Sequence, residues 1–330
     1  MNSYQGALFL FSVFFFTGVS SQSTAGITGV RDSSFNVISE YNKLKKNYPF
    51  IEEVKEVHSD SVIEKKNITY CKTGKRKLLL DAFIPSWQGK IKRPAILIIH
   101  GGGWRSGNRS LHYPLAERLT LLGYVCFTPE YRLSTEALYP AGVNDIKAAI
   151  RWVKAHAAKF NIDTTQIAVA GHSAGGELAA FMGATNGIKR FDGTGSCQTA
   201  VSSAIRAVID IDGILAFIHP ESGEGDDSKS TSAATYWFGY SKTDNPAIWI
   251  EASPLTHAGK NNPPVLFLNS SVTRMHAGRN DYIDTLRKYG IYTEVHEFEN
   301  SPHSFCLFAP WFDPTVNYID VFLKKVFELN

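Results

Sequence analysis

The hexapeptide Gly171-His-Ser-Ala-Gly-Gly176 constrains this chain more than any other feature. It directly follows the short apolar run Ile167–Ala170, and it leads into the small and apolar residues of Gly175–Ala184, which are typical of a helix. A strand that turns sharply into a helix lifts the residue between them clear of the sheet, and small residues on either side relieve the crowding of that turn. Ser173 is therefore the predicted nucleophile, and it needs a base to activate its hydroxyl.

Short apolar runs alternate with helical patterns along most of the chain. The expected strands are Ser61–Tyr70, Lys77–Ile84, Ala95–Ile99, Tyr124–Thr128, Gln166–Ala170, Arg206–Ile211, Val265–Asn269 and Tyr292–Phe298, the first two forming an antiparallel hairpin. The expected helices are Leu111–Leu122, 143–157, Gly175–Ala184 and Val316–Phe327. This alternation predicts an α/β fold with a mostly parallel central sheet and helices on both faces.

Composition and charge exclude several classes of protein. The chain of 330 residues is 44% hydrophobic and 12% aromatic, which is enough for a large core. Its 34 basic and 31 acidic residues leave a net charge of +3, too small to predict a nucleic-acid partner. The four cysteines allow three disulfide pairings, and none stands in a CxxC pattern or beside a histidine pair. We expect no metal and no cofactor.

Three parts of different character follow one another along the chain. Residues 1–21 resemble a signal peptide, because the apolar stretch Ala7–Val19 is too short to span a bilayer and precedes small residues. We therefore expect a secreted or periplasmic protein with no membrane partner after cleavage. Residues 22–56 form a polar N-terminal arm, and 57–330 the catalytic domain. Within that domain, 213–264 has no clean periodicity and is predicted to be a cap-like insertion.

A glycine-rich turn, His100-Gly-Gly-Gly-Trp104, follows the predicted strand Ala95–Ile99. Backbone N–H groups that point at a developing negative charge stabilise it, and glycines let the backbone approach closely. We expect Gly102 and Gly103 to donate from this turn, together with the N–H of Ala174 after the predicted nucleophile.

The expected base is His303, in the loop Asn300–Phe305 after the last predicted strand. An imidazole titrates near neutral pH and can both accept and return a proton. The position of His303 also fits the chain order serine, acid, histidine.

These segments together resemble a known fold. HGGGW, PEYRLS with YPAGVNDIKAAIRWV, GHSAGG and SPHSF are similar to motifs of the α/β-hydrolase fold, within it the secreted carbohydrate-esterase and lipase-like branch, over roughly residues 57–330. The resemblance implies a serine esterase that acts through an acyl-enzyme on esters of carbohydrate, above all O-acetyl groups of plant polysaccharide such as xylan or pectin. Alternatives are a pectin methylesterase, a serine peptidase and a non-catalytic carbohydrate-binding protein.

The acid of the triad departs from the pattern of that family. Such enzymes commonly place an aspartate soon after the strand that corresponds to Val265–Asn269, but here the first acid is Asp281, twelve residues on. Asp281 is the leading candidate, Glu221 the second and Asp212 the third, since the acid needs only to orient the imidazole.

Four residues are candidates for substrate binding. Trp104 could stack on a sugar face. Arg274, His276 and Arg279 could meet a substrate carboxylate such as a uronic acid, or they could simply belong to a salt-bridged helix start.

Overall fold

The computed structural model describes residues 21–87, 89, 91–192, 197 and 200–329. Apart from Ser21, the predicted signal peptide lies outside the described residues. None of the helices in the described part of the chain is both long enough and apolar enough to cross a membrane.

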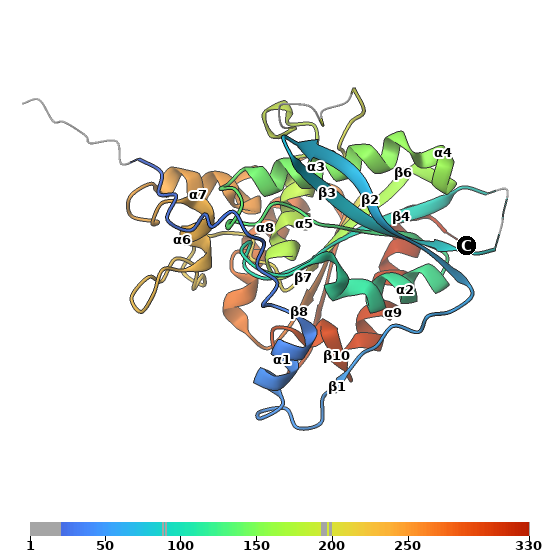
Figure 1. Ribbon diagram of the computed structural model, residues 1–330, viewed down its shortest axis with the longest axis horizontal. Helices are drawn as coiled ribbons and strands as arrows, with labels where there is room; N and C mark the ends of the chain where they lie inside the picture. The colour runs from blue at the N-terminus through green and yellow to red at the C-terminus, as the bar shows by residue number, and fades with distance from the viewer. Residues whose placement is uncertain (1–20, 88, 90, 193–196, 198–199, 330) are drawn as a thin grey trace, which may run out of the picture.

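Eight strands form the central sheet in the order β2-β3-β5-β4-β6-β7-β8-β9 (Figure 1). Their bounds are β2 Val62–Thr73, β3 Arg76–Pro85, β4 Arg93–Ile99, β5 Val125–Pro129, β6 Ile162–His172, β7 Ala207–Ile211, β8 Val265–Asn269 and β9 Thr293–Glu297. Strands β2, β3 and β5 pair antiparallel, and all pairs from β5 to β9 are parallel. The predicted fold class and the hairpin at its start are confirmed.

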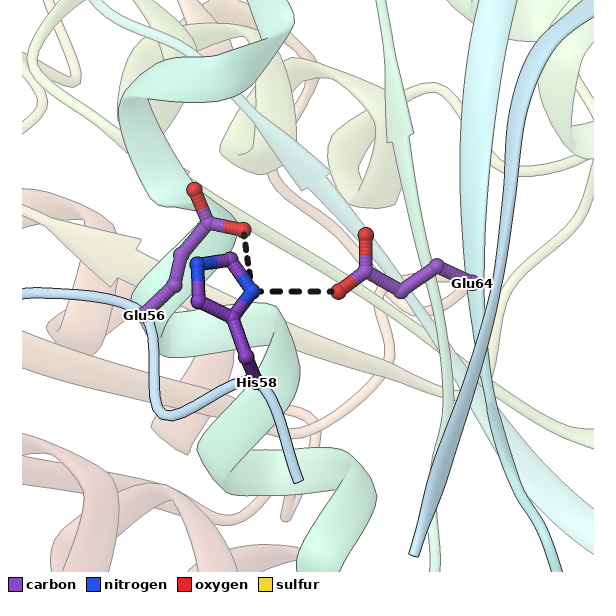
Figure 2. A group of neighbouring side chains, drawn as sticks. All are labelled: Glu56, His58 and Glu64. Carbon is purple, nitrogen blue, oxygen red and sulfur yellow. Dashed lines mark ion pairs between the residues drawn. The ribbon is translucent and has the colours of Figure 1, made fainter. Parts of the chain in front are cut away.

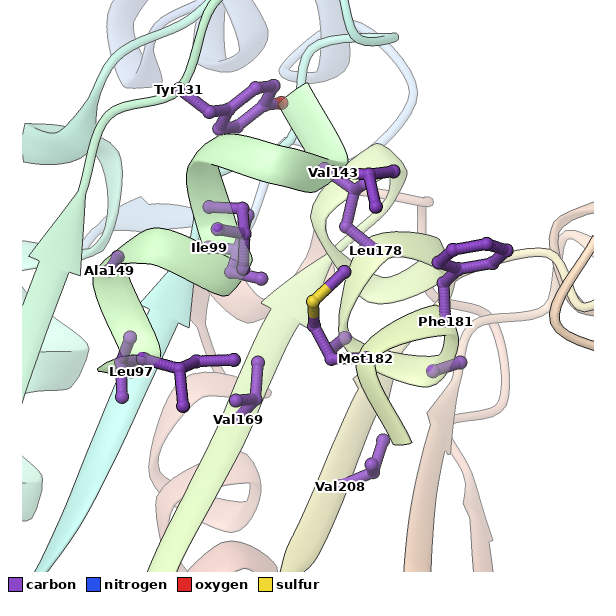
Figure 3. Close-up of a cluster of buried hydrophobic side chains, with 14 of the residues drawn as sticks. Leu97, Ile99, Tyr131, Val143, Ala149, Val169, Leu178, Phe181, Met182 and Val208 are labelled. Atoms are coloured by element: carbon purple, nitrogen blue, oxygen red, sulfur yellow. The ribbon is translucent and has the colours of Figure 1, made fainter. Parts of the chain in front are cut away.

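Helices cover both faces of the sheet because its strands are apolar on both sides. In β4, Leu97 and Ile99 point into the core under α3 (Ala141–Ala155) and α5 (Ala174–Ala184), where Val143 and Leu178 meet them (Figure 3). The alternate residues of β4 belong to the opposite core, against α2 (Tyr113–Leu121) and α9 (Phe312–Phe327). The remaining α-helices are α1 Val37–Leu44, α4 Ala157–Phe160, α6 Ala233–Phe238, α7 Pro246–Ala252 and α8 Arg279–Arg287.

The predicted insertion 213–264 carries the short helices α6 and α7, which project together from one end of the sheet (Figure 1). It is largely held by aromatic packing: Trp237 and Trp249 are buried, and Phe238 contacts both rings at centroid distances of 4.9 and 4.5 Å. A Gly at the C-terminus of α6, Gly239, adopts the left-handed conformation that ends the helix.

The N-terminal arm pairs with a short strand that lies just before the last helix. Strand β1 (Glu52–Glu53) pairs antiparallel with β10 (Phe308–Ala309), and these four residues form a separate two-stranded sheet. Cys71 of β2 forms a disulfide with Cys197, while Cys126 and Cys306 are buried free thiols. The sequence left three ways to pair the four cysteines, and the structure contains one bond, between Cys71 and Cys197.

Candidate active site

Ser173 stands at the turn between β6 and α5 in a conformation that side chains rarely adopt, with φ +58° and ψ −123°. The turn is tight enough that a Cβ on Gly171 would overlap the carbonyl of Gly175, and a Cβ on Gly175 would overlap that of Ile99. Glycine is thus required on both sides of Ser173. The strain at Ser173 places its hydroxyl at the carboxyl end of the sheet.

His303 lies between Ser173 and a buried aspartate. Its Nε2 is 2.8 Å from Oγ of Ser173, and its Nδ1 is 2.8 Å from Oδ2 of Asp212. Asp212 directly follows β7, and His303 follows β9, so two strand ends and the turn of Ser173 bring the three side chains together. The predicted pair of Ser173 and His303 therefore meets in the folded chain.

Asp212 is fully buried and held as a carboxylate. Burial by itself would raise its pKa, but the hydrogen bond from His303 and those from the amide and hydroxyl of Ser270 outweigh this, and the pKa lies below its ordinary value. Its charge is thus available to fix Nδ1–H of His303 and leave Nε2 as the acceptor for the serine proton.

The leading prediction for the acid, Asp281, is wrong, and so is the second, Glu221. Asp281 lies in the first turn of α8, where its side chain is 64% exposed and contacts His219 at 3.1 Å. Glu221 accepts a hydrogen bond from the amide of Gly278. Asp212, the third candidate, is the acid that contacts His303. The loop after β8 does not carry the acid; it carries Ser270, whose hydroxyl donates a hydrogen bond to Asp212.

The sequence does contain a signal for Asp212. The signal is the pair Asp212-Gly213, which directly follows an apolar strand. The structure shows why the glycine is needed, because a Cβ on Gly213 would overlap the amide of Glu177 near the start of α5. Asp212 itself has φ +55°. An aspartate in a strained position beside an obligatory glycine is typical of a functional turn.

The glycine turn lies against the nucleophile. A Cβ on Gly101 would come within 3.1 Å of the Cβ of Ser173, and Gly102 and Gly103 have φ of +114° and +60°. Ala174 is the first residue of α5, so its N–H has no partner within the helix. The structure thus brings the three predicted donors around the same turn as Ser173.

Residues of the N-terminal arm form hydrogen bonds with the residues that flank the glycine turn. Arg31 donates to Nε2 of His100 at 3.0 Å, and the amide of Phe35 donates to the hydroxyl of Ser106 at 2.8 Å. Burial, reinforced by Arg31, lowers the pKa of His100 to about 3, so this imidazole is neutral. Farther along the arm, Glu40 accepts a hydrogen bond from Ser304, the residue after His303. These contacts were not predicted, because nothing in the polar arm indicates its partners.

Trp104 does not offer a face to a sugar. Its ring is buried, stacked on Trp237 at 4.9 Å, and its Nε1 donates to Glu177 at 2.9 Å. The prediction that Trp104 binds substrate is wrong, since the insertion covers the ring. Burial raises the pKa of Glu177 well above its ordinary value, and nearby Asp210 adds to this.

The three predicted cations do not form an anion site either. Arg279 is held by Asn269 at 2.8 Å and Glu297 at 2.6 Å, and Arg274 lies 3.6 Å from Glu224. Burial and the charge of Arg279 lower the pKa of His276. Carboxylates from distant parts of the sequence thus already neutralise the two arginines.

A second polar cluster joins β2 to the segment before it. This cluster consists of Glu56, His58 and Glu64 (Figure 2). One possible ligand atom from each side chain lies within 4.8 Å of the other two. The His58 side chain is 71% exposed, and Lys66 forms an ion pair with Glu64 at 2.8 Å. These are the properties of a surface network of ion pairs.

The sheet order and its helical layers define an α/β-hydrolase. Solved structures with this fold include "Truncated form of carbohydrate esterase from gut microbiota", at 23% identity and a TM-score of 0.70 over 82% of this chain and 99% of that one. An esterase of Thermogutta terrifontis gives 24% identity and a TM-score of 0.65 over 81% of this chain and 95% of that one. The chain belongs to the BD-FAE family, whose profile matches residues 80–274 and so includes Ser173 and Asp212.

Curated relatives of the chain carry the names of ester hydrolases. "Probable carboxylic ester hydrolase LipM" of Mycobacterium tuberculosis is 30% identical over 65% of this chain and 50% of its own length. Carboxylesterase NlhH of the same species is 44% identical over 27% of this chain and 28% of its own. The chain thus matches half or less of the length of these two relatives.

Proposed function

We propose that the protein is a serine esterase that hydrolyses carboxylic esters of carbohydrate through an acyl-enzyme. The single observation that carries this proposal is the continuous contact from Ser173 through His303 to the buried carboxylate of Asp212. The names of the relatives support the reaction class.

The proposed reaction uses each group of the site in turn. Oγ of Ser173 attacks the ester carbonyl while its proton passes to Nε2 of His303, and the N–H groups of Gly102, Gly103 and Ala174 stabilise the oxyanion. The imidazolium, stabilised by Asp212, gives that proton to the departing alkoxide, which leaves as the alcohol. His303 then deprotonates a water molecule that attacks the acyl-enzyme, and the acid leaves as Ser173 regains its proton.

The proposed substrates are O-acetyl groups of polysaccharide, such as those of xylan or pectin, and the proposed location is outside the cytoplasm. A neighbouring structure that bears the name of a carbohydrate esterase supports the first. The disulfide of Cys71 and Cys197 supports the second, because such bonds persist in oxidising compartments. The pectin methylesterase alternative loses its main argument, since Arg274 and Arg279 are already paired.

The test is the release of acetate and methanol from acetylated xylan, acetylated pectin and methylated pectin, by the protein and by its Ser173→Ala variant. Acetate that appears only with the unaltered protein is the expected result. Methanol in place of acetate would overturn the substrate assignment. No cleavage of any ester, including 4-nitrophenyl acetate, would overturn the function itself.

A further inference from the structure

His172 is the residue before the nucleophile, and the reaction described above gives it no role. It is the last residue of β6, and its side chain is fully buried. Its Nε2 lies 3.0 Å from the backbone carbonyl oxygen of His303, and the centroids of the two imidazole rings are 5.0 Å apart. The residue beside Ser173 thus contacts the backbone of the predicted base.

The polarity of this contact defines the state of the His172 ring. A carbonyl oxygen only accepts hydrogen bonds, so Nε2 of His172 carries a proton and donates. Its Nδ1 is buried without a hydrogen-bond partner in the described part of the chain, and a proton there would be an unsatisfied donor. Burial, with the charge of His303 as a smaller cause, lowers the pKa of His172 to about 3. His172 is therefore a neutral donor at the pH at which a histidine base works.

Three neighbours fix the orientation of this ring. A Cβ on Gly101 would lie 3.1 Å from Nδ1, so the glycine turn packs against that edge of the ring. Phe35 of the N-terminal arm stacks on the ring at a centroid distance of 6.5 Å, and His112 meets it edge to face at 5.8 Å. A ring held on these sides presents its Nε2–H in one direction, toward the carbonyl of His303.

The predicted base needs such support because it lies in a loop. Its imidazole has to stay 2.8 Å from both Ser173 and Asp212, and a displacement of about 1 Å from such a geometry costs about a hundredfold in rate. His172 and Ser173 are neighbours in the chain, so a bond from His172 ties the loop to the backbone that carries the nucleophile.

We propose that His172 is a positioning residue, which holds the imidazole of His303 in line with Ser173 by donating a hydrogen bond to the carbonyl oxygen of His303. This inference rests on the proposed function, because it concerns the base of that reaction. His172 acts through the backbone of His303 and takes no part in the transfer of the proton.

Two substitutions of His172 test the proposal in the hydrolysis of 4-nitrophenyl acetate. The amide nitrogen of glutamine reaches the place of Nε2, whereas that of asparagine, one bond shorter, reaches only the place of Nδ1. We expect His172→Gln to keep kcat within about fivefold and His172→Asn to lose about a hundredfold. KM is expected to stay within about twofold in both, because His303 acts in acylation and in deacylation alike.

His112 provides the matched control. It is a second buried imidazole, and neither of its ring nitrogens has a hydrogen-bond partner among the described residues. His112→Asn makes the same change of side chain without removing a bond to His303, so it is expected to keep kcat within about fivefold. Thermal unfolding gives the fraction of each variant that is folded at the assay temperature, and kcat is expressed per folded molecule.

A second measurement needs no variant and so stands even if a substitution prevents folding. Nitrogen-15 NMR of the histidine-labelled protein is expected to show a neutral His172 ring with its proton on Nε2 from about pH 5 to pH 8. A proton on Nδ1 in place of Nε2 would overturn the inference.

A folded His172→Asn variant with nearly the parent kcat also overturns the inference, as does an equal loss in His172→Gln or in His112→Asn. These results leave the esterase reaction standing, because the unaltered protein still cleaves the ester. Absence of cleavage by the unaltered protein rejects the proposed function, and the inference with it.

Discussion

Replacement of Asp212 by asparagine tests the assignment of the triad most directly. The asparagine has nearly the same shape, so it removes the charge 2.8 Å from Nδ1 of His303 and little else. Two unit charges at that distance attract each other by about 6 kcal/mol at an effective dielectric constant of about 20. This stabilisation exists only once His303 has taken the serine proton, so its loss raises the barrier.

At about 1.4 kcal/mol for each factor of ten, the expected loss in kcat is about four orders of magnitude. The assay is the initial rate of 4-nitrophenyl acetate hydrolysis, with thermal unfolding to show that the variant folds. Asp281→Asn and Glu221→Gln are the comparison variants, and each is expected to keep its rate within about fivefold. If Asp281→Asn lost as much rate as Asp212→Asn, the geometric reasoning would be refuted.

Three further predictions concern the turn, a buried acid and the disulfide. Gly102→Ala is expected to lower kcat by about a hundredfold in the same assay, because φ of +114° and overlap with the carbonyl of Ser106 displace the turn that supplies the oxyanion donors; an unchanged rate would contradict that role. Glu177→Gln is expected to increase the free energy of unfolding at pH 8 by about 1 kcal/mol or more. The pKa of Glu177 is raised in the folded state, so the parent protein loses stability as pH rises above the unfolded pKa, and chemical denaturation at pH 5 and pH 8 should show the gain growing with pH. Replacement of both Cys71 and Cys197 by serine is expected to reduce the free energy of unfolding by about 2–5 kcal/mol, because the bond closes a loop with a sequence separation of 126; urea denaturation with an unchanged midpoint would argue against this.

The sheet could be predicted from the sequence because its signals are local. An apolar run such as Ala95–Ile99 cannot lie at the surface, and the pattern of strand, glycine-flanked serine and helix occupies adjacent residues. For the same reason Ser173 and His303 could be identified from their own segments.

The acid that contacts His303 could not be chosen correctly from the sequence, because the choice depends on which strand ends lie next to each other in the folded sheet. Asp212 and Asp281 both follow strands, and only the folded sheet shows that Ser270 holds the former while His219 contacts the latter. The ion pairs of Arg274 and Arg279 could not be predicted for a similar reason, because the acids that neutralise them come from other elements: Glu224 from the loop before α6 and Glu297 from β9.

The N-terminal arm has a consequence for the order in which the candidate active site is completed. Glu40 lies early in the chain, whereas its hydrogen-bond partner Ser304 is 264 residues farther on. Contacts between residues so distant in sequence form late in folding. The loop of His303 therefore receives this support only after the segments of Glu40 and Ser304 have come together, whereas the glycine turn can receive its support from Arg31 and Phe35 earlier.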